Sequence, residues 1–69
     1  MIEVFKTNVQ EICQAEKMVA LLLQYFPGSK INFDLQDCDK ILRMEHKEIC
    51  SETIIRLVQS HGYQCGILD

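Results

Sequence analysis

The sequence has no tryptophan, only one proline and only three glycines among its 69 residues. It also contains no internal repeat and no low-complexity segment, so nothing in it predicts a linker between domains. A chain of this length supports one domain with a small core, and a hydrophobic fraction of 48% is too high for a disordered chain. We therefore expect a single folded domain over residues 1–69.

Basic residues and long apolar runs are also scarce. Lys and Arg number 7 against 10 Asp and Glu, the net charge is -3, and the cations are scattered along the chain. This balance predicts no nucleic-acid binding. The longest apolar run, Met18–Leu23, is far shorter than the roughly 18 residues of a membrane span, which predicts no membrane insertion. The first residues lack the basic region and cleavage site of a signal peptide, so we expect a cytoplasmic protein.

The four cysteines, at positions 13, 38, 50 and 65, include no C-x-x-C pair. That pair is the usual local sign of a zinc or redox site. In a cytoplasmic chain we expect reduced thiols. Free cysteine often acts as a small buried residue, so packing in the core is the first interpretation for at least two of the four.

The first half of the chain shows a strand pattern followed by a helix pattern. β-branched and aromatic residues over 1–7 predict a strand. Asn8, with Glu11 three positions later, matches a capping box and predicts the start of a helix. Apolar residues recur at helical spacing over 9–26. The Pro-Gly pair at 27–28 predicts the end of this helix, because proline cannot continue the hydrogen-bond ladder.

The second half shows strand patterns first, then a helix, then a strand. Alternating apolar and polar residues predict a half-buried strand, and an acidic turn follows it. A return strand, a helix closed by a His-Gly pair and a last short strand complete the chain. The expected elements are a strand at 30–36, a turn at 37–39, a strand at 40–45, a helix from 50–52 to 61–62 and a strand at 63–68.

This order of elements is βαββαβ. It predicts an α+β fold of the ferredoxin-like sandwich type, with a four-stranded antiparallel sheet and two helices on one face. Such a sheet leaves its other face uncovered in a monomer, so self-association is expected as one form of partnership. The fold hosts many unrelated functions, and it does not by itself predict one.

Three segments of the chain resemble the heavy-metal-associated domain family, which includes small copper chaperones. The segment Ile49–Tyr63 looks like that family's second helix with its closing Gly-Tyr pair. Phe26-Pro27-Gly28 is similar to the end of its first helix, and Phe33-Asp34-Leu35 to its second strand. The resemblance covers essentially the whole chain. It implies the ferredoxin-like fold, together with a C-x-x-C loop that binds Cu(I) or Zn(II) through two soft thiolates.

The family's metal motif is missing from this chain. Counted back from Pro27, the metal loop falls on 9–15, and its two cysteine positions are occupied by Ile12 and Ala15. Neither side chain can bind a metal, so we expect no metal at these positions and no cofactor. The resulting prediction is a small, non-enzymatic binding or accessory domain that acts through a protein partner or through self-association.

Two alternatives remain open. In a βαββαβ sandwich, Cys13, Cys38 and Cys65 should lie at one end of the sheet and Cys50 at the other. The first three thiols could form a relocated Cu(I) or Zn(II) site of a metallochaperone. The second alternative is a thiol-redox protein that uses one reactive cysteine near a helix start, with Cys13 as the expected residue.

Overall fold

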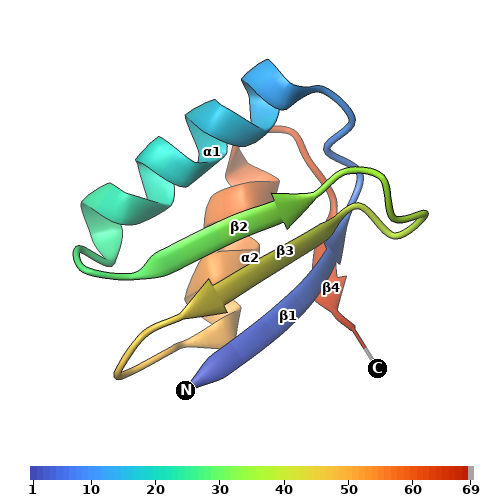
Figure 1. Cartoon of the computed structure of the whole chain (residues 1–69). Coiled ribbons are helices and arrows are strands. Elements are labelled where there is room, and N and C mark those ends of the chain that lie inside the picture. The colour runs from blue at the N-terminus through green and yellow to red at the C-terminus, as the bar shows by residue number, and fades with distance from the viewer. Residues whose placement is uncertain (69) are drawn as a thin grey trace.

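The computed structural model describes residues 1–68, which form a two-layer α+β fold (Figure 1). The elements are β1 (Ile2–Thr7), α1 (Ile12–Tyr25), β2 (Lys30–Asp34), β3 (Ile41–Glu45), α2 (Ser51–Ser60) and β4 (Cys65–Ile67). The strands form one antiparallel sheet in the order β2-β3-β1-β4. Both helices lie on one side of this sheet (Figure 1). The predicted ferredoxin-like βαββαβ sandwich is therefore confirmed.

The core lies between the sheet and the helices. It is built from side chains of every element except the two edge strands, which contribute partly buried residues around it. The buried members are Phe5, Met18, Leu22, Leu42, Met44, Ile54 and Val58. Phe5 of β1 lies opposite Leu42 of β3, and Leu42 lies opposite Phe33 of β2. This apolar row crosses the sheet and holds both helices on one face.

The first helix begins later than the sequence predicts. Asn8 does not cap it, because the Asn8 Oδ1 accepts the backbone N–H of Gln64 at 2.7 Å. Glu11 is the N-cap residue, and its backbone N–H donates to the side chain of Gln14 at 3.3 Å. Val9 is still fully buried, although it lies in the loop before the helix. The shift leaves Ile12, the first helical residue, 71% exposed.

The strands β2, β3 and β4 are shorter than the sequence predicts. The second strand ends at Asp34 rather than at residue 36, because the Asp34 carboxylate accepts the N–H of Gln36 and starts the turn. Lys40 lies in the turn with φ of 47°, so the return strand begins at Ile41. The last strand covers only Cys65–Ile67. No helix within residues 1–68 combines the length and the apolar character needed to cross a membrane.

Candidate functional site

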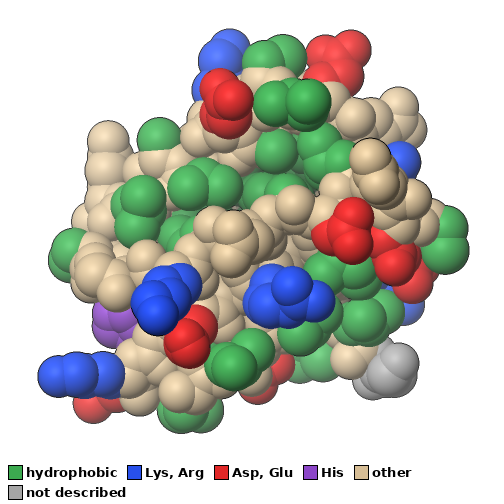
Figure 2. Space-filling model, viewed as in Figure 1, with side chains coloured by type: hydrophobic (Ala, Val, Ile, Leu, Met, Phe, Trp, Pro, Cys, Tyr) green, Lys and Arg blue, Asp and Glu red, His purple; other side chains and the backbone are tan. Residues whose placement is uncertain are grey.

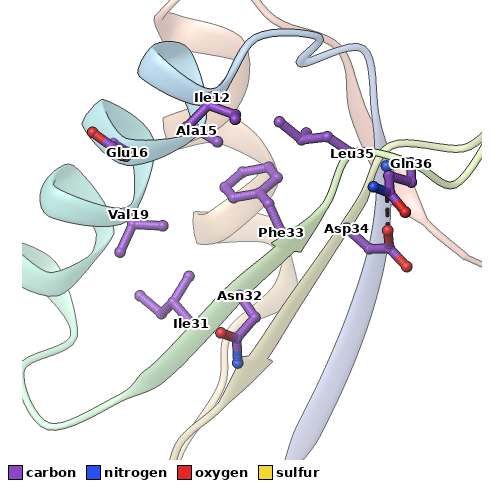
Figure 3. Close-up of a pocket in the computed structure, with 10 residues that line it drawn as sticks. All are labelled: Ile12, Ala15, Glu16, Val19, Ile31, Asn32, Phe33, Asp34, Leu35 and Gln36. Atoms are coloured by element: carbon purple, nitrogen blue, oxygen red, sulfur yellow. Dashed lines mark hydrogen bonds between the residues drawn. The ribbon is translucent and has the colours of Figure 1, made fainter.

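A groove lies on the surface between α1 and the edge strand β2. Its volume is about 530 Å³. Ile12, Ala15, Glu16 and Val19 of α1 line one side, and residues 31–36 line the other (Figure 3). Figure 2 shows hydrophobic side chains gathered along this hollow, with charged groups around it.

The groove exists because β2 is only partly covered by α1. Ile31 and Phe33 point from β2 toward the helix, whereas Asn32 between them points away (Figure 3). In a strand with one face on the core, inward residues are normally buried, yet Ile31 and Phe33 remain half-exposed. Apolar surface of this kind, framed by polar groups, is typical of an interaction site.

The groove lies directly beside an unpaired strand edge. β2 pairs with β3 alone, so its other side faces outward. Along a strand, alternate residues direct their backbone N–H and C=O to opposite sides. Within residues 1–68, the backbone groups of 30–34 form hydrogen bonds only to β3. Every second residue of β2 therefore offers backbone donors and acceptors to another chain.

The cysteines lie at the ends of the sheet where the topology places them. Cys65 pairs with Thr7 at the end of β1, and the N–H of Thr7 donates to the carbonyl of Asp39 in the β2–β3 turn at 3.0 Å. Cys38 in this turn and Cys65 line one shallow pocket of about 320 Å³. Cys50 follows β3, whose last residue pairs with the start of β1, so it lies at the opposite end.

The three thiols of the relocated metal site do not converge on one point. Within residues 1–68, the one group of three Cys, His, Asp or Glu ligand atoms lying within 4.8 Å of one another belongs to Asp37, Cys38 and Asp39. Cys13 is exposed in the first turn of α1, where its thiol lies 3.7 Å from the Glu11 carboxylate. As the chain is folded, Cys13, Cys38 and Cys65 are not close enough together to share one ion.

The acidic turn has an ordinary structural role. The Asp37 carboxylate accepts the N–H of Asp39 at 2.9 Å, and the carbonyl of Asp37 accepts the N–H of Lys40 at 3.0 Å. The Lys40 ammonium donates to the carbonyl of Leu35 at 2.8 Å, which closes the turn from the other side. All three residues of the group 37–39 are exposed.

The Cys50 thiol, at the start of α2, has a pKa below its ordinary value. Cys50 is the exposed N-cap residue of α2, and its side chain does not form a capping hydrogen bond. The Thr53 hydroxyl and then the Thr53 amide nevertheless lower the pKa of the Cys50 thiol, because both can stabilise the thiolate. The spacing of Cys50 and Thr53, from N-cap to third helical residue, is a signal visible in the sequence.

Cys65 has the opposite character. Burial raises the pKa of its thiol to about 11, because the thiolate would lose solvation beside the core. A thiol of this kind is a poor nucleophile and a poor metal ligand at neutral pH.

The two positions at which the family motif would carry cysteines belong to the groove. Ile12 lies at one end of it, exposed, and Ala15 is buried in its wall (Figure 3). The class of protein defined by these features is a ferredoxin-like sandwich with an apolar groove beside an open strand edge. No protein-family model, no curated protein and no solved structure matches the chain.

Proposed function

We propose that this protein is a non-enzymatic binding module that takes an extended segment of a partner protein as an additional strand on β2. The observation that carries the proposal is the position of the α1–β2 groove directly beside the unpaired edge of β2. In strand addition, main-chain hydrogen bonds provide affinity and pockets for alternate side chains provide specificity. In this protein the unpaired backbone edge of β2 and the apolar groove lie side by side.

The resemblance to heavy-metal-associated domains fits this proposal as a shared fold with a changed first helix. Ile12 and Ala15 supply apolar surface to the groove, where the family has its metal thiolates. An apolar side chain from a partner strand would replace a metal ion as the occupant of this region. The four free thiols suit a reducing compartment such as the cytoplasm, which we propose as the location.

A selection experiment tests the proposal. A displayed library of random peptides long enough to form a strand is selected against the protein, and the enriched peptides are mapped by amide chemical-shift changes. We expect the largest changes at residues 30–35. The Val19→Asp variant, which puts a charge in the groove, should lose binding at least about tenfold.

Val4→Asp is the matched control. Val4 is a half-buried valine like Val19, but it lies on β1, away from the groove. The control should keep peptide affinity within about threefold. Failure to enrich any peptide, or binding that maps to β4 or to the open face of the sheet, would contradict the proposal.

A second candidate function is soft-metal binding at the turn, favoured by the close approach of Asp37, Cys38 and Asp39. Cu(I) and Zn(II) are the metals that thiolate ligands suit. The test is a competition titration of the reduced protein with each metal, repeated with Cys13→Ser, Cys38→Ser and Cys65→Ser. One-to-one binding lost only in Cys38→Ser would place the metal at the turn. Loss in all three variants would restore the relocated three-cysteine site, and no binding above a cysteine-free variant would reject both.

A further inference from the structure

The exposed edge of β2 carries a sequence that is complementary to itself. The strand reads Lys30-Ile31-Asn32-Phe33-Asp34. An antiparallel pairing of two such strands about Asn32 places Lys30 of each copy opposite Asp34 of the other. The same pairing places Ile31 opposite Phe33, and Asn32 opposite itself.

The two faces of the strand agree with this pairing. Lys30, Asn32 and Asp34 are exposed on the open face of the sheet, and Ile31 and Phe33 are half-buried on the helix face. Opposed residues in an antiparallel pair lie on the same face, so charges meet opposite charges and apolar groups meet apolar groups. Opposite charges and aromatic–β-branched pairs are both favourable cross-strand neighbours.

Other registers lose this complementarity. A shift of two residues in either direction removes both Lys30–Asp34 pairs and leaves each charge opposite an uncharged residue or the turn. A shift of one residue would place helix-face side chains opposite open-face ones. The register about Asn32 also has a two-fold axis through it, which is the symmetry of most homodimers.

We infer that a second copy of this chain occupies the β2 edge, forming a continuous eight-stranded antiparallel sheet across two molecules. This inference rests on the proposed function, because it names the occupant of the same edge and groove. The two-fold axis places the α1–β2 grooves of both copies next to each other on one face. Ile31 and Phe33 of each copy thereby gain apolar cover that the monomer does not give them.

Charge reversal tests the register directly. Association is measured by sedimentation equilibrium from about 10 μM to about 1 mM, the range in which small interfaces associate. Lys30→Asp and Asp34→Lys should each weaken self-association at least about tenfold, because two attractive pairs become repulsive in every dimer. The double variant K30D/D34K should recover the wild-type affinity to within about threefold.

Mixing the two single variants gives the most specific result. Lys30→Asp has acidic residues at both positions and Asp34→Lys has basic residues at both. An equimolar mixture should therefore associate while each variant alone does not. Lys47→Asp and Glu48→Lys are the matched controls, since they make the same changes in net charge at exposed positions outside β2. Both should associate as the wild type does.

A cross-link gives a second, independent test. In a protein whose four cysteines are replaced by serine, Asn32→Cys should form a disulfide dimer when diamide is added as oxidant. Directly opposed residues lie about 4.5–5.5 Å apart at Cα, within the range of a disulfide. Lys30→Cys should not cross-link, because two residues at that position would be separated by about 13 Å along the strand.

The outcomes separate this inference from the proposed function. A wild-type protein that stays monomeric, or a dimer that ignores the charge reversals, overturns the inference. If peptides selected from the library still bind at residues 30–35 in that case, the proposed function stands without self-pairing. If neither peptides nor a second copy bind at residues 30–35, both the inference and the proposed function are wrong.

Discussion

The two edges of the sheet are built differently, although both strands lie beside a helix. β4 has three residues, and the residue before it and the residue after it each bond back toward β1. The backbone N–H of Gln64 donates to the Asn8 side chain, and the N–H of Leu68 donates to the carbonyl of Val4 at 3.0 Å. β2 has five residues in regular alternation and a groove along its helix face. A short edge strand resists pairing with other chains. The comparison indicates that both edges are unpaired, but that β2 offers the longer strand and the only one of the two with this groove beside it.

The largest expected difference in unfolding free energy is between removing an aromatic ring from the central strand β1 and removing one from the edge strand β2. Phe5→Ala should cost about 3–5 kcal/mol of unfolding free energy, because the ring is fully buried in the core. Phe33→Ala should cost about 1–2 kcal/mol, because its ring is already half-exposed to the groove. The measurement is the urea midpoint and slope for each variant.

Leucine substitutions at the same two positions are the control if Phe5→Ala does not fold. Each leucine variant should lose less unfolding free energy than the alanine variant, and the loss should still be larger at Phe5 than at Phe33. Equal losses at the two positions would show that β2 is as firmly part of the core as β1, and would weaken the case for an available edge.

The glycines that lead into the two edge strands should show no such contrast. Gly28 precedes β2 with φ of 84°, and Gly62 precedes β4 with φ of 89°. A Cβ at either position would meet no atom within 4 Å, so alanine costs only the backbone strain. We expect each Gly→Ala change to destabilise the fold by about 1 kcal/mol, and Gly→Asn by less. Thermal denaturation of the four variants measures this. A much larger loss at one site would mean that its turn limits the stability of that edge.

Thiol reactivity should distinguish the partly buried Cys65 of β4 from the exposed Cys50 at the start of α2. The thiolate is the reactive form, so a lowered pKa brings reaction to lower pH and a raised pKa delays it. Cys50 should be alkylated by iodoacetamide at lower pH than an ordinary thiol. Cys65 in β4 should reach half its maximal rate only near pH 11. Site-resolved mass spectrometry over a pH series gives both profiles, and a Thr53→Val variant should shift only that of Cys50. Equal profiles for Cys50 and Cys65 would contradict the difference in burial.

The order of elements could be predicted from local patterns, because strand alternation, helical spacing and the glycines at the ends of both helices are local signals. The start of α1 could not. Asn8 is a good cap by residue type, but it accepts a hydrogen bond from Gln64, which is remote in sequence. This contact between distant segments takes Asn8 out of the capping role, and the helix begins after Glu11 instead.

The groove was not predictable either, since it depends on how far α1 lies from the edge of the sheet. Ile12 and Ala15 drew attention as lost metal positions, and their place in the groove wall became visible only in three dimensions. The thiols illustrate the same limit. Topology gave the correct end of the sheet for Cys38 and Cys65, but not the separations of the sulfur atoms. The lowered pKa of the Cys50 thiol depends on a neighbour three residues away, and the sequence alone could have indicated it.

The attachment of the β2–β3 turn to β1 has a mechanical consequence. The Thr7 hydroxyl donates to the carbonyl of Lys40 at 2.6 Å, and the Thr7 N–H donates to the carbonyl of Asp39. A strand bound along β2 and pulled along its length would load the sheet in shear. That load would pass through the β2–β3 ladder and through this turn into the central strand. Many hydrogen bonds would then have to break together, so tension along the strands should be resisted far better than peeling of β2 from its free end.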